Sequence, residues 1–145
     1  MSERPRLAEL KIGARLPEHR RTVSQNDFDL MAVASLDYNP VHTNVEWAKR
    51  AKVFGVPSTV AHGMMTMTFQ ASMVTDWIHP AGGNLRAMES KFTRPVLPGD
   101  TVTSTGEVIE IHYSGRQPIF AVVALTSINQ RGETVAASKA EVTLP

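Results

Sequence analysis

Residues 62–77 read His-Gly-Met-Met-Thr-Met-Thr-Phe-Gln-Ala-Ser-Met-Val-Thr-Asp-Trp, and this stretch decides the fold. Apolar residues recur nearly all round a helix that starts at Gly63 and ends near Trp77, which predicts a buried helix rather than a half-exposed one. Several of its polar members are small threonines and serines, so neighbouring backbone can come close. The stretch therefore predicts one central helix that other elements must cover.

After this helix the sequence period changes from helical to strand-like. Strands rich in Thr, Val and Ile are expected over 85–92, 101–113, 119–125 and 133–144. Turn residues at 114–117 and 129–132 predict hairpins, and Gly106 is a candidate β-bulge. Consecutive hairpins would give a long antiparallel meander wrapped around the helix, an α+β domain. The uncovered face and free edges of such a sheet favour a dimer.

Before the central helix, the sequence predicts an edge strand within 11–23 and two short helices. Ser24 and Asp27 form a capping-box pattern, which predicts a helix over 25–36. That helix should end before the turn at 37–40, because the proline at position 40 disfavours a helical conformation in the residue before it. Asn44 is a suitable cap for a second helix over 45–52. Residues 1–10 are charged and are expected to be loosely ordered, within a single domain of residues 1–145.

Composition places the chain among ordinary globular proteins. It has 145 residues, 42% of them hydrophobic and 20% charged, with a formal net charge of +1 and no basic stripe that would favour nucleic acid. There is no cysteine, hence no disulfide and no thiolate chemistry. No apolar run is long enough for a secretory signal or a membrane span. These observations predict a soluble cytoplasmic protein.

Asp37 and His42 are the first candidates for chemistry. They flank a rigid turn that contains Pro40, so their side chains can converge on one water molecule, as a carboxylate and an imidazole do in proton transfer. Taken alone, Asp37 is more typical of a residue that stabilises a turn, and His42 of a partly buried, hydrogen-bonded histidine. The pair is more informative than either residue.

His62 and Gly63 are the second candidate group. Gly63 can serve close packing at the start of a buried helix, or its N–H can bind a developing oxyanion with the help of the helix dipole. The spacing is compatible with both interpretations. The sequence has no Gly-x-Ser-x-Gly elbow, no phosphate loop and no Cys–His metal pattern. His42 and His62 are far apart, with no acid or cysteine at ligand spacing, so no metal site is predicted.

Two blocks of sequence carry a family resemblance. Asp37-Tyr38-Asn39-Pro40-Val41-His42, followed by Ala48 and by Ala61-His62-Gly63-Met64, resembles the signature of MaoC-like dehydratases, the R-specific enoyl-thioester hydratases. The segment at 91–102, Lys-Phe-Thr-Arg-Pro-Val-Leu-Pro-Gly-Asp-Thr-Val, is similar to a second block of that family. Within the family, the chain is similar to the single-domain (3R)-hydroxyacyl-thioester dehydratase subunits of actinobacteria.

The resemblance implies a hot-dog fold, in which a curved antiparallel sheet wraps around one long helix. It also implies a hydro-lyase whose sheets join edge to edge, in a homodimer or with a second hot-dog subunit. Asp37 and His42 would activate the water that adds to a 2-enoyl thioester, and the Gly63 amide would bind the thioester oxygen. Asn39, Pro40, His62 and Met64 would contact the substrate or fix the turn. The substrate would be carried on coenzyme A or acyl carrier protein, with no metal or redox cofactor.

Two positions depart from the family pattern, and two other functions compete. Asn44 stands where the family often has an acid, and Ala71 stands where some members have a serine in the active site. A hot-dog thioesterase and a non-catalytic partner subunit of a heteromeric dehydratase are the alternatives. The presence of both Asp37 and His42 argues against the non-catalytic subunit.

Overall fold

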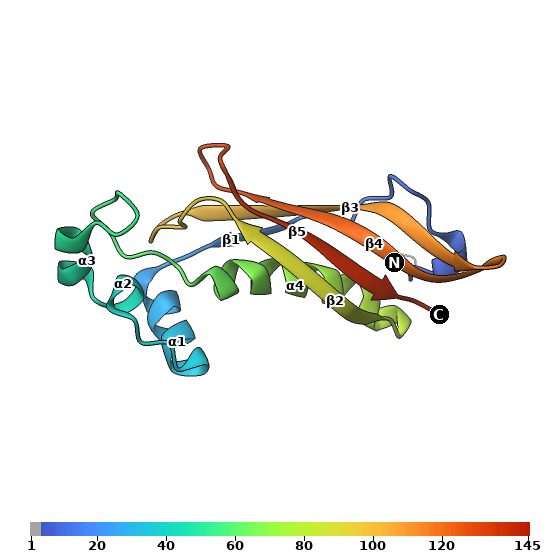
Figure 1. Cartoon of the computed structure of the whole chain (residues 1–145), viewed down its shortest axis with the longest axis horizontal. Coiled ribbons are helices and arrows are strands. Elements are labelled where there is room, and N and C mark those ends of the chain that lie inside the picture. Colours follow the sequence, from blue (N-terminus) through green and yellow to red (C-terminus); the bar gives the residue numbers. More distant parts are fainter. Residues whose placement is uncertain (1–3) are drawn as a thin grey trace.

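The computed structural model describes residues 4–145, which form one curled sheet wrapped around one long helix (Figure 1). In chain order the elements are η1 (Leu7–Glu9), β1 (His19–Thr22), α1 (Gln25–Ser35), α2 (Pro40–Thr43), α3 (Val45–Ala51), α4 (Gly63–Ile78), η2 (His79–Ala81), β2 (Asn84–Phe92), β3 (Thr101–Ser114), β4 (Gln117–Ile128) and β5 (Thr134–Thr143). The helix α4 lies along one face of the sheet, and α1–α3 gather at the end opposite the C-terminus. This arrangement is the hot-dog fold, so the expected fold class is confirmed.

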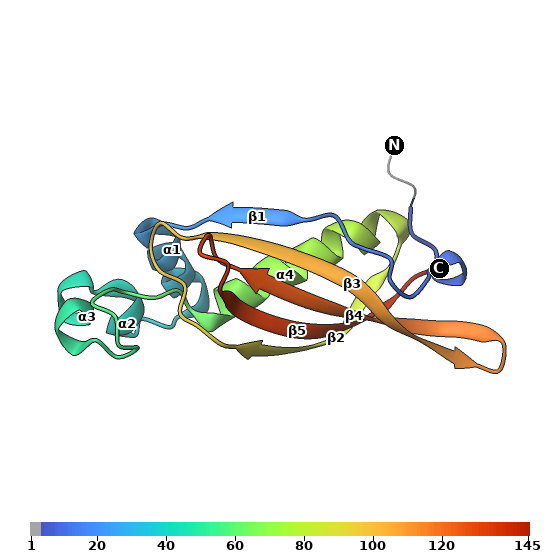
Figure 2. The ribbon, with the colours of Figure 1, turned by 90° about the horizontal axis from the view of Figure 1, so that it is seen from above.

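The order of strands differs from the predicted run of consecutive hairpins. The sheet is antiparallel with the order β1-β3-β4-β5-β2, so β2 pairs with β5 and not with β3, which follows it in the chain. Figure 2 shows β1 and β2 at opposite edges of the sheet. The hairpins β3–β4 and β4–β5 are confirmed, and Gly115 takes the positive φ of 61° that the first turn requires. The predicted meander was wrong for β2, because residues 93–100 carry the chain from β2 at one edge to β3 on the far side of β4 and β5.

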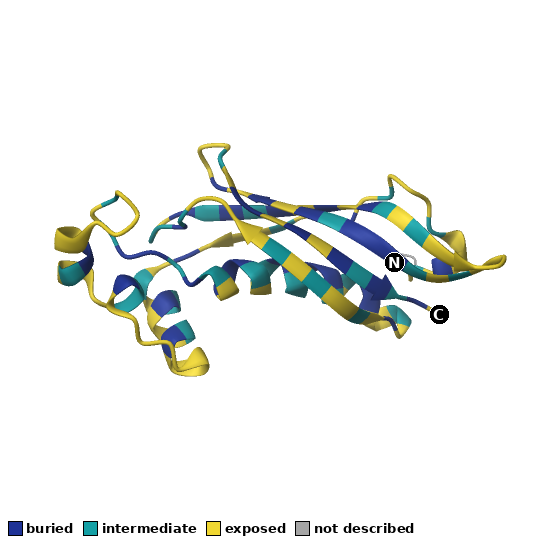
Figure 3. Cartoon of the chain, viewed as in Figure 1, coloured by how far each residue is buried: buried dark blue, intermediate teal, exposed yellow. Residues whose placement is uncertain are grey.

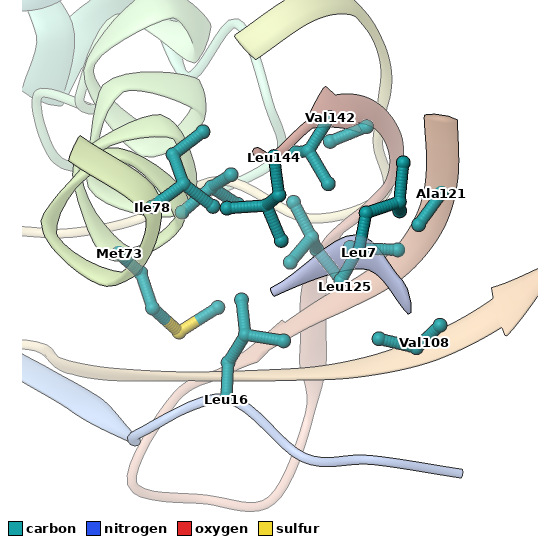
Figure 4. Packing of buried hydrophobic residues seen from close by; sticks show 12 residues of the cluster. Leu7, Leu16, Met73, Ile78, Val108, Ala121, Leu125, Val142 and Leu144 are labelled. Atoms are coloured by element: carbon teal, nitrogen blue, oxygen red, sulfur yellow. The ribbon is translucent and has the colours of Figure 1, made fainter. Parts of the chain in front are cut away.

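The helix α4 buries one face and exposes part of the other. Met73, Val74 and Ile78 pack into a cluster with residues of β3, β4 and β5 (Figure 4). On the opposite face, Met64 is 57% exposed and Thr68 is also exposed, as the banding of α4 in Figure 3 shows. Within this single chain, the predicted all-round burial of the helix was therefore wrong.

A buried polar layer joins α4 to the sheet. The side-chain amide of Gln70 is fully buried, donates to Ser127 Oγ at 2.9 Å and accepts from the hydroxyl of Ser138. Ser127 in turn bonds Ser104 at 2.7 Å, and Ser138 bonds Ser90 at 2.8 Å. The layer thus crosses β3, β4, β5 and β2. Because a buried amide is costly without partners, this layer fixes the rotation of α4 on the sheet.

Gly106 does not mark a β-bulge. It pairs directly with Leu125 in an uninterrupted stretch of the β3–β4 register, and the first irregularity falls between Val108 and Glu110. A Cβ atom at position 106 would lie 2.8 Å from Leu125 Cδ2 and 3.2 Å from Met73 Cε. The glycine is needed for close packing of α4 on the sheet, which is another common reason for glycine within a strand.

Residues 4–10 are held against the domain, contrary to the expectation of a loose segment. Leu7 is 5% exposed, belongs to the main core cluster and donates its N–H to Pro145 O at 3.3 Å. The charged residues around Leu7 gave no indication in the sequence that it would be buried. Leu7 and Leu144 belong to the same core cluster. Residues 1–3, also part of that expectation, lie outside the described residues. Within residues 4–145, no helix is long and apolar enough to cross a membrane.

The segment 93–100 is anchored by Asp100, a buried carboxylate at the start of β3. Asp100 accepts hydrogen bonds from Gln130 at 2.7 Å, from Arg131 at 3.1 Å and 3.3 Å, and from the Leu97 N–H at 3.0 Å. Burial alone would raise the pKa of Asp100, but these hydrogen bonds together lower the pKa below its ordinary value of 3.8. The ionised carboxylate therefore holds this segment to the β4–β5 turn.

Replacing Asp100 by Asn should lower the free energy of unfolding at pH 7 by about 1–3 kcal/mol, because charged hydrogen bonds are lost in a buried site. A lowered pKa in the folded state stabilises the protein above the ordinary carboxyl pKa, and the stabilisation is lost as the pH falls through the folded-state value. The difference between wild type and Asp100→Asn in urea unfolding should therefore shrink below about pH 4. Glu89→Gln, at an exposed position on β2, is the matched control. An Asp100→Asn protein as stable as wild type at pH 7 would contradict the role of this carboxylate.

Candidate active site

The turn between α1 and α2 positions Asp37. Leu36 ends α1 in the left-handed conformation with φ 61°, and Asn39 then caps α2 by accepting from the Val41 N–H at 3.1 Å. Pro40 follows as the first residue of α2, where its fixed φ suits the helix. The Asn39 N–H donates to Asp37 Oδ1 at 3.2 Å. One carboxylate oxygen is thus occupied by the turn, and the other faces the neighbouring histidines.

His42 is oriented by two hydrogen bonds. Its ring Nδ1 lies 2.7 Å from Val60 O, and because a carbonyl only accepts, Nδ1 carries the ring proton. Its backbone carbonyl accepts from the Gln25 side chain at 2.8 Å. The remaining nitrogen, Nε2, therefore has a free lone pair in the neutral ring.

Asp37 and His42 face each other without bonding directly. The distance from Asp37 Oδ2 to His42 Nε2 is 3.7 Å. A carboxylate oxygen and an unprotonated Nε2 are both acceptors, so they cannot share a hydrogen bond when both are deprotonated. A water molecule that donates one hydrogen to each would satisfy both groups and leave its own lone pair available for attack.

A cavity of about 330 Å³ opens beside this pair. Its lining comes from α2, the segment 54–61, the start of α4, the end of β2, the segment 93–96 and Val135. His42 and Gly63 both line it. Gly63 is the first residue of α4, so its N–H has no acceptor within the helix and lies at the positive end of the helix dipole. The cavity therefore joins an imidazole to a potential oxyanion donor.

His62 contacts both Asp37 and His42 but does not line the cavity. It is 3% exposed, its Nε2 lies 3.0 Å from the Asp37 backbone carbonyl, and its ring stacks on His42 with centroids 3.8 Å apart. Asn39 and Pro40 belong to the turn, and neither lines the cavity. Met64 points to solvent from α4. Contact of these four residues with a substrate stays a prediction.

A larger and more open groove of about 630 Å³ lies elsewhere on α4. Its walls are β1, α1 and the middle of α4, with Arg21, Met31 and Phe69 among the lining side chains. None of the predicted site residues lines it. The smaller cavity is therefore the candidate active site, because it alone of the two is lined by His42 and Gly63. Asp37 does not line it but lies 3.7 Å from His42.

The fold brings Asp37, His42 and His62 together, which the sequence argument against a metal site did not foresee. One ligand atom from each lies within 4.8 Å of the others. A metal-bound histidine usually donates its second ring N–H to an acceptor, as His42 does to Val60. His62 would have to donate from Nδ1, which is buried and has no hydrogen-bond partner among the described residues. Asp37, His42 and His62 therefore fit a bound water molecule better than a bound metal ion.

Two supporting residues were missed by the sequence analysis. Gln25 bonds both the His42 carbonyl and the Thr59 hydroxyl, so it ties α1 to α2 and to the segment before α4. Val60 accepts from His42 Nδ1 and donates its N–H to Val41 O at 3.1 Å. Val60 acts through its backbone, which its residue type does not indicate. Gln25 lies between the capping-box residues Ser24 and Asp27, and its long-range contacts leave no local sequence pattern.

The fold and the site together define a hot-dog domain with an acid–imidazole pair at the start of its central helix. Comparison with known families is consistent with this class, because residues 10–130 match the MaoC like domain. The chain belongs to this family.

Individual relatives support the same assignment. The chain is 35% identical over 85 residues to the (R)-specific enoyl-CoA hydratase of Rhodospirillum rubrum, an alignment that covers 59% of this chain and 57% of the relative. The chain thus spans little more than half the length of that relative. The structure of the R-hydratase PhaJ1 from Pseudomonas aeruginosa superimposes with a TM-score of 0.83 and 27% identity, covering 97% of this chain and 85% of that one.

A third neighbour shows the fold alone. It is the ChsH1-ChsH2 complex from Mycobacterium tuberculosis, with a TM-score of 0.78, 21% identity, and coverage of 93% of this chain and 98% of that one. The sheet and its central helix are therefore retained at an identity too low to carry an argument about the site.

The tautomer of His42 can be measured directly. Long-range ¹H–¹⁵N NMR of the neutral ring should show the proton on Nδ1, because that nitrogen donates to Val60 O. His112, an exposed ring on β3 beside Glu110, is the internal comparison. A His42 ring protonated on Nε2 alone would contradict the proposed water site.

Proposed function

We propose that the protein adds water reversibly to trans-2-enoyl thioesters and forms (3R)-hydroxyacyl thioesters, as a hydro-lyase. One observation carries the proposal: His42, whose Nε2 lies 3.7 Å from Asp37 Oδ2, lines the same cavity as Gly63. The R specificity is that of the (R)-specific enoyl-CoA hydratase and of the R-hydratase PhaJ1, to which this chain is similar.

The proposed hydration mechanism uses the two acceptor atoms of the pair, Asp37 Oδ2 and His42 Nε2. The bound water gives one proton to the pair while its oxygen bonds to C3 of the enoyl group. The electrons of the double bond move towards C2 and the thioester oxygen, and the pair then delivers a proton to C2. The net change is addition of H and OH, so the pair returns to its starting state.

Gly63 would stabilise the enolate formed in between. Gly63 lines the cavity at the N-terminus of α4, where a developing negative charge on the thioester oxygen is favoured. A Cβ atom at position 63 would lie 3.0 Å from the Phe92 ring. Glycine therefore also leaves room for the end of β2 at this point.

The reaction as proposed needs no metal and no redox cofactor, because proton transfer and a backbone N–H supply the catalysis. The acyl group would arrive on coenzyme A or on acyl carrier protein. Arg94 lines the cavity, is 60% exposed and pairs with Glu133 at 3.3 Å, so an exposed cationic side chain borders the cavity.

Association with a second hot-dog chain is part of the same proposal. The strand β2 pairs only with β5 and leaves its other edge free within the described chain. Unpaired edges are natural places for another strand to add. Phe92, at the end of β2, lines the cavity, so a homodimer or heterodimer joined along β2 would place the partner beside the site.

Removing either member of the pair tests the activity. Asp37→Asn and His42→Gln should each lower kcat for hydration of crotonyl-CoA by about 10²–10⁴-fold, because a general acid–base group is lost. The reaction is followed by the loss of enoyl-thioester absorbance. Thermal unfolding should change little for Asp37→Asn, since that side chain is half exposed.

Asp76→Asn and His112→Gln are matched controls, because both residues lie away from the cavity and each forms its ion pair elsewhere. Both controls should retain wild-type turnover. Wild-type turnover in the Asp37→Asn/His42→Gln double variant would refute the assignment. Release of one free thiol for each enoyl thioester lost would instead identify a thioesterase, because hydration leaves the thioester intact.

A further inference from the structure

His62 has a buried nitrogen without a partner. Its Nδ1 is shielded from solvent and makes no hydrogen bond among the described residues, while the whole residue is 3% exposed. Its other nitrogen, Nε2, lies 3.0 Å from the backbone carbonyl of Asp37. The proposed reaction does not use this side chain, so its burial at the site needs a physical reason.

These contacts determine where the ring proton lies. A carbonyl oxygen can only accept, so Nε2 must be the donor to Asp37 O. Nδ1 then holds a lone pair, and the unpaired atom is an acceptor. The opposite tautomer would leave a buried N–H unpaired and place two acceptors, Nε2 and the carbonyl oxygen, 3.0 Å apart. His62 and His42 therefore carry their protons on opposite nitrogens.

His62 also contacts both members of the acid–imidazole pair. The hydrogen bond holds the main chain of Asp37, and the ring face stacks on His42 at 3.8 Å between centroids with planes 24° apart. As the N-cap residue of α4, His62 directly precedes Gly63. One rigid side chain thus connects the carboxylate, the imidazole and the proposed oxyanion donor.

We propose that His62 is a positioning residue that fixes Asp37 and His42 relative to the Gly63 amide, and that it touches no substrate. The inference rests on the proposed hydratase function and explains why a histidine is buried here. The Asp37 side chain is 52% exposed and belongs to a turn between two short helices. Without the bond to its carbonyl, this turn is free to move, and small displacements of catalytic groups are costly to the rate.

Two single variants separate the two contacts. His62→Gln keeps an amide N–H where Nε2 stands but loses the ring, and His62→Phe keeps a ring against His42 but loses the donor. We expect His62→Phe to lower kcat for crotonyl-CoA by about 10²-fold with KM nearly unchanged. His62→Gln should recover most of that loss, because the bond to Asp37 O is restored.

Wild-type kcat in His62→Phe would overturn the proposal, and so would a His62→Gln protein as slow as His62→Phe. A rise in KM that accounts for the whole loss would identify His62 as a substrate contact instead. His79→Phe is the matched control, because His79 is an exposed histidine at the other end of α4. It should retain wild-type kcat and KM.

A measurement on the unmodified protein keeps the test independent of activity and of variant folding. Long-range ¹H–¹⁵N NMR should show the His62 proton on Nε2 and the His42 proton on Nδ1. A His62 proton on Nδ1 would overturn the positioning bond even if the protein is an active hydratase. Absence of hydratase activity together with the expected tautomers would refute the proposed function while leaving the Asp37–His62 contact established.

Discussion

The buried amide of Gln70 is the constraint on which the arrangement depends. Its side chain hydrogen-bonds Ser127 on β4 and Ser138 on β5. These two serines in turn hydrogen-bond serines on β3 and β2. Apolar packing alone tolerates small rotations of a helix on a sheet, whereas a buried amide needs its partners in fixed directions. The rotation of α4 then sets the direction of the Gly63 N–H at its first turn. The proposed oxyanion donor is thus positioned by side chains in the interior of the domain.

The acid–imidazole pair depends on a second set of contacts, which lies outside the sheet. Gln25 at the start of α1 and Val60 in the segment before α4 hold His42 from two sides, while Asn39 holds one oxygen of Asp37. Each of these hydrogen bonds has a backbone group as one partner. None of them uses Asp37 Oδ2 or His42 Nε2, the two side-chain atoms that could move protons. Asp37 Oδ2 and His42 Nε2 are left as two acceptors facing one another, which favours a donor such as water between them.

Local patterns predicted much of this structure, and long-range contacts account for what was missed. Three predicted features depend only on residues close together in the chain, and all three are observed. They are the capping box of Ser24 and Asp27, the cap at Asn44 and the hairpin at Gly115. The pairing of β2 with β5, the burial of Leu7 and the approach of His62 to Asp37 join residues distant in the chain. No helical or strand period encodes such contacts. The family resemblance supplied the fold, but it did not supply a physical role for His62.

The position of the cavity follows from the lengths of α4 and β2. The helix has 16 residues and rises about 24 Å, and the following strand has 9 residues and spans about 30 Å in the opposite direction. Because these lengths are similar, the chain returns to the start of α4 when β2 ends. Phe92 accordingly lies against Gly63, where even a Cβ atom would come within 3.0 Å of its ring. The segment 93–96 then forms a wall of the cavity, so the block of sequence at 91–102 meets the block at 37–64 at the candidate site.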